Sequence, residues 1–254
     1  MERIIKRDAN FEMKILRTIH TAYGFFVFIL VFILLFSFLS IPIIFPLQFK
    51  LTGIINRAWA KLLFTLIFIP YKIECRTKLD PKRVYIFCPN HFSYLDIPTM
   101  GLNPINTIFV GKSDMENVPL FGYMYRKLHL TVDRSSLRSR GNTLLASMNA
   151  IDEGKSLVIF PEGGMITQHA PQMVPFKDGA FRAAIEKQIA IVPVTIPFNH
   201  KMLPDQSPIR LHWGEVKIIF HVPIETSGMT LADTEKLKQE VYSVIDMELK
   251  KQNG

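Results

Sequence analysis

Residues 84–98 read VYIFCPNHFSYLDIP, a passage from an apolar run into a polar loop from which the rest of the chain can be interpreted. The first part, 84–88, is short, apolar, rich in β-branched and aromatic residues and bounded by prolines, which is typical of a buried strand. Asp96 stands two residues before Pro98, the arrangement of an N-cap residue and a first-turn proline. The stretch therefore predicts a strand, a loop that contains His91, and a helix that Asp96 caps.

His91 and Asp96 suggest a general base and the carboxylate that orients it. Their separation of five across a loop lets the side chains turn towards each other, so that Asp96 holds one ring nitrogen and the other faces a cleft. An unperturbed imidazole has a pKa of about 6.5, which suits proton abstraction near neutral pH. The spacing by itself equally allows Asp96 to be only a helix cap, with His91 bonded to the backbone.

Short apolar runs alternate with helical or polar stretches after residue 78. We expect strands at 84–88, 107–110, 128–132, 157–160, 189–196 and 216–221. Helical spacing is present at 138–153, 179–187 and 230–251. Thr230 and Asp233 form a capping-box arrangement at the start of the last of these helices.

This alternation predicts an α/β fold, a mostly parallel sheet covered by helices. In such sheets, reacting groups gather beyond the carboxyl ends of the strands. His91, Arg134 and Glu162 each follow a predicted strand directly, so we expect one cleft to collect them.

The N-terminal part, residues 1–78, is expected to associate with a membrane. No charged residue occurs at 23–49, a longer run than the about 20 apolar residues that cross a bilayer or the about 7–15 of a signal peptide. An amphipathic stretch follows at 51–70, and basic residues flank both sides, so the charges give no clear orientation. We expect two helices that enter one leaflet with both ends in the cytosol, and a single transmembrane anchor is the alternative. Residues 79–254 form the expected catalytic domain.

The composition limits the class of protein. With 254 residues and 48% hydrophobic content, the chain is long enough for one domain of ordinary size and an appendage. The formal charge of +8 indicates an anionic partner, but the basic residues are dispersed and no groove-reading motif occurs, which argues against nucleic acid. Cys75 and Cys88 are the only cysteines, too few for a disulfide framework or a thiolate zinc site.

The block NHFSYLD at 90–96 resembles the Asn-His-x-Ser-x-x-Asp signature of the glycerolipid acyltransferases, the family of 1-acylglycerol-3-phosphate acyltransferase. Further blocks resemble those of the family, in the same order: KSDMENVPLFG at 112–122, VDR at 132–134, FPEG at 160–163, KDG at 177–179 and VPV at 192–194. The FPEG match stops after Gly163, because Gly164, Met165 and Ile166 replace the family's threonine, arginine and serine.

The resemblance implies that His91 and Asp96, the HX4D motif, are catalytic. It also implies an acceptor site, with Arg134 on the phosphate of the acceptor; the predicted substrate-binding residues are Lys112, Arg134, Glu162, Gly163 and Lys177. An arginine fork beside hydroxyl groups suits a phosphate, although an Asp-Arg pair is also found in ordinary surface turns.

An acyl thioester is already activated, so its transfer needs a deprotonated hydroxyl near the carbonyl and donors for the oxyanion, and no serine nucleophile. We therefore expect His91 to take the proton from the free hydroxyl of lysophosphatidic acid, which yields phosphatidic acid. The family implies acyl-CoA or acyl carrier protein as the donor, and no cofactor or metal. The expected location is the cytoplasmic membrane, among membrane lipids, with the catalytic domain facing the cytosol.

Three other interpretations stay open. The altered residues 164–166 suggest a lyso-amino-acid lipid as the acceptor, such as lyso-ornithine lipid. The basic charge suits a non-catalytic membrane-surface protein that binds acidic lipids. A third interpretation takes His91, Asp96, Glu162 and His169 as a metal site, although they share no known ligand spacing.

Overall fold

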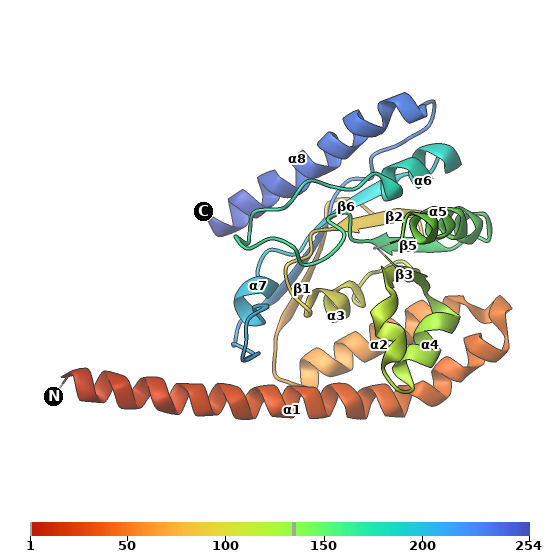
Figure 1. Ribbon diagram of the computed structural model, residues 1–254. Coiled ribbons are helices and arrows are strands. Elements are labelled where there is room, and N and C mark those ends of the chain that lie inside the picture. Colours follow the sequence, from red (N-terminus) through yellow and green to blue (C-terminus); the bar gives the residue numbers. More distant parts are fainter. Residues whose placement is uncertain (1, 134–135) are drawn as a thin grey trace.

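The computed structural model describes the backbone of residues 2–133 and 136–254, and their side chains except those of 2–11, 112, 115, 137 and 140. At its centre is a seven-stranded sheet with the order β1-β7-β6-β2-β5-β3-β4 (Figure 1). The strands are β1 (Tyr71–Cys75), β2 (Ile86–Pro89), β3 (Thr107–Lys112), β4 (Leu130–Val132), β5 (Ser156–Ile159), β6 (Ile191–Thr195) and β7 (Val216–Phe220). The pair β6 and β7 is antiparallel and the other neighbours are parallel, so the predicted mostly parallel sheet is confirmed.

Helices cover both faces of the sheet. They are α1 (Glu2–Ile44), η1 (Pro46–Gln48), α2 (Lys50–Leu66), α3 (Asp96–Met100), η2 (Ser113–Asn117), α4 (Phe121–Leu128), α5 (Leu137–Asp152), α6 (Gly179–Lys187), α7 (Asn199–Met202), η3 (Leu231–Asp233) and α8 (Thr234–Asn253). Alternate side chains of β2 point to opposite faces. Ile86 and Cys88 pack in the cluster that contains α5, α6 and α8, whereas Phe87 packs with Met100 of α3 on the other face.

The predicted elements differ from the observed ones mainly at the edges of the sheet. A strand is present at each predicted place, but 128–132 begins at Leu130 because α4, which the sequence analysis does not predict, takes up Leu128. The unpredicted strand β1 pairs with β7 at the sheet edge. The expected domain boundary after residue 78 comes after β1 in the chain. The first strand of the sheet therefore belongs to the part assigned to the membrane helices. The capping box of Thr230 and Asp233 is confirmed.

Helices are present at both N-terminal hydrophobic stretches. Within the described residues, Glu12–Ile44 of α1 is the one helical stretch long and apolar enough to cross a membrane. Val27 and Val31 of α1 pack in one cluster with Leu63 and Phe64 of α2. The two helices therefore share a hydrophobic interface.

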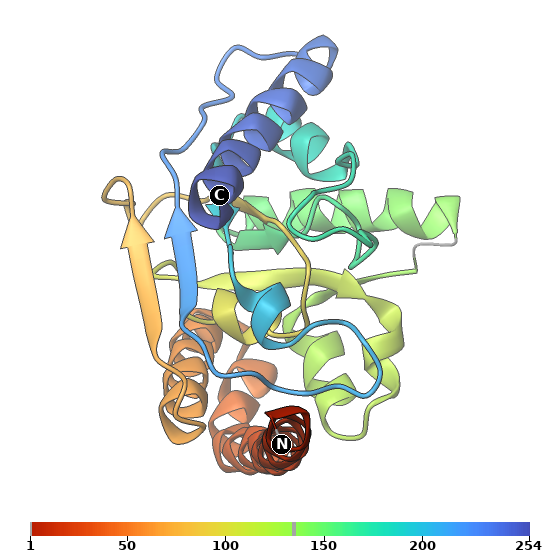
Figure 2. The same cartoon turned by 90° about the vertical axis from the view of Figure 1, so that its left-hand side faces the viewer.

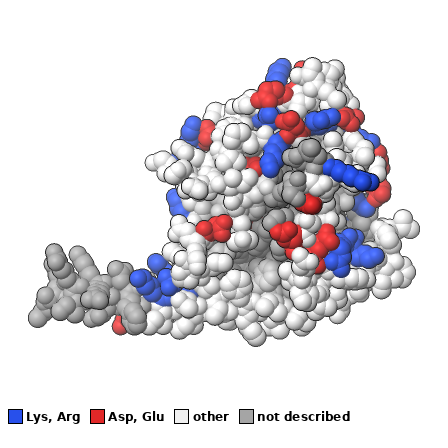
Figure 3. Space-filling model, in the orientation of Figure 1, with Lys and Arg blue, Asp and Glu red and all other residues white. Residues whose placement is uncertain are grey.

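Helix α1 runs along the base of the molecule, as the two perpendicular views show (Figures 1 and 2). Its buried side packs against Leu211, which precedes β7, and, near Leu39, against α4. Its other side exposes large apolar side chains, here called the outer face of α1: Phe25, Phe26, Ile29, Leu30, Ile33, Leu34, Phe38 and Ile41. In Figure 3 the described part of the base is mostly uncharged, apart from Lys and Arg side chains beside the grey N-terminal end, whereas charged side chains are spread over the rest of this face.

Candidate active site

His91 and Asp96 are in direct contact. Nδ1 of His91 lies 3.0 Å from Oδ2 of Asp96, and the same oxygen accepts the backbone N–H groups of Phe92 at 2.8 Å and Ser93 at 2.9 Å. The prediction that Asp96 is an N-cap is wrong, because it is the first residue of α3, after Leu95 at the cap, and its carboxylate turns back to the loop. The alternative in which His91 bonds only to the backbone is also wrong.

The imidazole of His91 is held in one orientation. Its ring stacks on Phe160, which directly follows β5, with the centroids 4.0 Å apart and the planes 26° apart. Because the Asp96 carboxylate already accepts backbone N–H groups, Nδ1 is the donor to it. Nε2 makes no hydrogen bond within the described residues, and 11% of the side chain is exposed. A fixed Nδ1–H and a free Nε2 are what a general base requires.

Glu162 fixes the backbone next to the imidazole. Its side chain is fully buried, Oε1 accepts the N–H of His91 at 2.7 Å, and Oε2 accepts the N–H of Val174 at 3.1 Å. Burial raises the pKa of Glu162 to about 7; the two N–H groups oppose this shift and the charge of Asp96 adds to it. Both oxygens are thus occupied within the protein, and the predicted contact of Glu162 with an acceptor stays a prediction.

Gly163 and Lys177 lie beside this carboxylate. The φ angle of Gly163 is +81°, and a Cβ atom there would lie 2.5 Å from Nζ of Lys177. The backbone N–H of Lys177 donates to the carbonyl of Pro161 at 2.8 Å, which anchors the lysine next to the turn after β5. The positive φ angle favours glycine at this position, and a side chain there would displace the end of Lys177. The structure therefore brings His91, Glu162, Gly163 and Lys177 into one neighbourhood.

The segment after β6 supports the same turn. The amide of Asn90 donates to the carbonyl of Ile196 at 3.0 Å and accepts its N–H at 2.7 Å. Nδ2 of Asn199 donates to Oδ1 of Asp96 at 2.9 Å. No sequence motif assigns a role to Asn199. The available signal was its place just beyond a predicted parallel strand, at the edge where functional groups gather.

Lys112 and Arg134 are expected at the same edge, because β2, β5, β3 and β4 are parallel and end there. Lys112 is the last residue of β3 and pairs with Val132, the last residue of β4. The side chain of Lys112 and all of Arg134 lie outside the described residues. Their contacts with an acceptor stay predictions.

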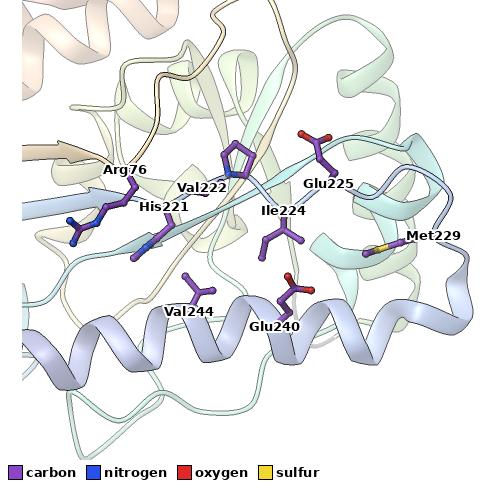
Figure 4. A pocket seen from close by; sticks show the side chains of 9 residues that line it. Arg76, His221, Val222, Ile224, Glu225, Met229, Glu240 and Val244 are labelled. Carbon is purple, nitrogen blue, oxygen red and sulfur yellow. The ribbon is translucent and has the colours of Figure 1, made fainter.

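The cleft drawn in Figure 4 lies elsewhere. It has a volume of about 680 Å³ and lies between the end of β7 and helix α8. Its lining residues are Arg76, His221, Val222, Pro223, Ile224, Glu225, Met229, Glu240 and Val244, none of which is a predicted site residue. Among the described side chains, no three His, Cys, Asp or Glu residues are grouped so that they could hold a metal ion, and the metal interpretation gains no support.

Known proteins resemble the chain in both sequence and fold. A family model described as Acyltransferase matches residues 71–197. The 1-acyl-sn-glycerol-3-phosphate acyltransferase of Haemophilus influenzae is 30% identical over 203 residues, which cover 76% of this chain and 80% of that protein. A chloroplastic protein of the same name from Arabidopsis thaliana is 30% identical over 188 residues, 72% of this chain, and the chain spans about half of its length, 51%.

The crystal structure of PlsC, the 1-acyl-sn-glycerophosphate (LPA) acyltransferase of Thermotoga maritima, shares the fold. The TM-score is 0.78 at 21% identity, with 95% of this chain and 98% of that chain covered. The sequence matches, together with the blocks that surround His91 and Glu162, show that this chain belongs to the glycerolipid acyltransferase family.

Proposed function

We propose that this protein transfers a fatty acyl group from an acyl thioester to the free hydroxyl of 1-acylglycerol-3-phosphate and so forms phosphatidic acid. The observation that carries the proposal is the His91–Asp96 pair, in which Nδ1 is bound to the carboxylate and Nε2 has no partner among the described residues. The acceptor is supported by the names of the Haemophilus influenzae and Arabidopsis thaliana relatives, both 1-acyl-sn-glycerol-3-phosphate acyltransferases.

In the proposed mechanism His91 is the general base. Nε2 takes the proton of the acceptor hydroxyl, while Asp96 holds Nδ1–H and stabilises the imidazolium. The hydroxyl oxygen attacks the thioester carbonyl, the C–S bond breaks, and the leaving thiolate takes the proton back from His91. The donor is acyl-CoA or acyl carrier protein, and the sequence of steps uses no cofactor. Positioning of the two substrates supplies a large part of the rate.

We propose that the phosphate of the acceptor is bound by Arg134 with help from Lys112 and Lys177. The position of Lys177 against Gly163, next to the residue that holds His91, supports a cation near the reacting hydroxyl. A lyso-amino-acid lipid is the second candidate acceptor. It is favoured by residues 164–166, where Gly-Met-Ile stands in place of the family's Thr-Arg-Ser. Met165 thus replaces an arginine that would help Arg134 to bind a phosphate.

We further propose that α1 and α2 lie in the cytosolic leaflet of the cytoplasmic membrane and that the catalytic part faces the cytosol. Support comes from contacts of α1 with the rest of the molecule along much of its length, from Thr21, whose Oγ1 accepts the N–H of Leu211 at 2.8 Å, to Leu39, which packs with α4. A helix held in this way cannot stand perpendicular to the body, and its outer face is free to meet lipid.

The proposed acceptor is tested by acyl transfer in detergent, with lysophosphatidic acid and lyso-ornithine lipid side by side and with acyl-CoA and acyl carrier protein as donors. We expect product on lysophosphatidic acid, and Arg134→Ala should raise the KM for this acceptor strongly. Product only on the amino-acid lipid, or an unchanged KM in the variant, would favour the second candidate. Lipid binding without transfer from any donor would support the non-catalytic interpretation.

A further inference from the structure

We propose that Asn199 is a positioning residue of this site, which holds the carboxylate of Asp96 and through it the imidazole of His91. The inference rests on the proposed function. Asn199 lies outside the sequence blocks that resemble those of the family and is 103 residues from Asp96 along the chain.

The amide of Asn199 is fully buried and both of its N–H groups are used. Nδ2 donates to Oδ1 of Asp96 at 2.9 Å and to Oγ1 of Thr99 at 2.9 Å. Oγ1 of Thr99 in turn donates to the carbonyl of Leu95 at 2.7 Å, so it is free to accept. The orientation of the amide follows from these partners, because a flipped amide would place its oxygen against the carboxylate oxygen of Asp96.

The two oxygens of Asp96 have different partners. Oδ2 binds Nδ1 of His91 and two backbone N–H groups of the loop, whereas Oδ1 has Asn199 as its one donor within the described residues. The side chain of Asp96 is fully buried, so water does not replace a lost donor without rearrangement. Without Asn199, Oδ1 loses its one donor, and only the contacts of Oδ2 still oppose rotation of the carboxylate about its Cβ–Cγ bond, so the partner of His91 is held less firmly.

A purely structural Asn199 would instead anchor the segment after β6. Asn253 provides a control, because this half-buried asparagine also holds the segment. Its Nδ2 donates to the carbonyls of Pro197 at 3.4 Å and Leu249 at 3.0 Å, and it makes no contact with Asp96. Loss of either amide loosens the segment, but only the loss of Asn199 disturbs the carboxylate.

The experiment compares wild type, Asn199→Ala, Asn199→Asp and Asn253→Ala as purified full chains in detergent, with acyl transfer kinetics and thermal unfolding. Removing a hydrogen bond to a charged group should lower kcat of Asn199→Ala by about 10- to 100-fold, with KM values for donor and acceptor unchanged. Asn199→Asp keeps the shape of the side chain but replaces the donor with a carboxylate oxygen, so its kcat should fall at least as far. Asn253→Ala should stay within about twofold of wild type.

Several results would overturn the inference. A wild-type kcat in folded Asn199→Ala would show that the residue only fills space, and Asn199→Leu, which keeps a similar volume without a donor or a second buried carboxyl group, decides if the alanine variant does not fold. An equal loss in Asn253→Ala would assign the effect to the segment, and a raised KM at unchanged kcat would indicate contact with a substrate. If wild type itself transfers no acyl group, the proposed function fails first and the role of Asn199 fails with it.

Discussion

The carboxyl group of Glu162 links the stability of the site to pH. Burial raises its pKa from the ordinary 4.5 to about 7 in the folded protein. Between these pH values the folded state binds more protons than the unfolded state. The free energy of unfolding therefore decreases as the pH rises. The contribution of Glu162 is fully present below about pH 4.5 and is lost as the pH passes about 7.

Replacing Glu162 with glutamine removes this titration. Relative to Glu162→Gln, wild type should lose roughly 3 kcal/mol of unfolding free energy between about pH 5 and 8. Urea unfolding in detergent at several pH values measures the difference, and the exposed Glu153→Gln serves as the control. A difference between wild type and Glu162→Gln that does not change with pH would contradict the assignment.

Alanine variants of Gly163 and Gly154 distinguish the effect of backbone strain from that of a steric clash. Their φ angles are +81° and +79°, but a Cβ atom at Gly163 would strike Lys177, whereas one at Gly154 meets nothing within 4 Å. Each alanine variant should lose roughly 1–3 kcal/mol of stability from the strained backbone. We expect Gly163→Ala alone to raise the KM for the acceptor, and equal kinetics in both variants would argue against a role for Lys177 in binding.

At the scale of elements, the central strands can be predicted because both of their faces are covered and their sequences are apolar runs. Strand β1 is harder to predict, since its five residues alternate Lys72 and Glu74 with apolar residues over a stretch too short to be told from the basic flank of the preceding helix. Spacing alone also does not tell whether Asp96 turns towards its helix or its loop. That choice depends on N–H groups that point at the carboxylate only once the loop is folded. The contact between Asn199 and Asp96 depends on the tertiary fold, because the two residues are 103 positions apart in the chain.

Helix α2 is predicted to be a fixed part of the catalytic body. Nη1 of Arg57 donates to the carbonyl of Asn103 at 3.0 Å and Nη2 to Oδ1 of Asn106 at 2.6 Å, both in the loop before β3. Arg57→Ala should lower the unfolding free energy by about 1–3 kcal/mol in detergent, because it leaves two partly buried acceptors without their donor. Lys61→Ala, an exposed change on the same helix, is the control. Equal stability of the two variants would mean that α2 is not firmly docked.

At the scale of the whole molecule, the length of an apolar segment does not determine its orientation, which packing decides. The sequence predicts helices at 23–49 and 51–70 but leaves a leaflet hairpin and a spanning anchor open. One side of α1 packs against the body of the protein and the other exposes apolar side chains. This arrangement suits a helix that lies in one leaflet beside the body, as the hairpin requires.

An N-terminal tag tests this arrangement. In sealed inverted vesicles, whose cytosolic face points outwards, protease should remove the tag as readily as it removes a C-terminal one. A tag that is protected until detergent is added would contradict the leaflet arrangement and support a spanning helix. Cleavage of the C-terminal tag shows that the protease reaches the cytosolic face, and protection of a periplasmic marker protein shows that the vesicles are sealed.

The most direct test of the account is the rate of acyl transfer to lysophosphatidic acid by purified His91→Ala beside wild type. We predict a loss of about 10²–10⁴-fold, the usual contribution of a general base, in a variant that still folds and unfolds cooperatively. A folded His91→Ala variant that keeps more than about a tenth of the wild-type rate would contradict the role of His91 as the base.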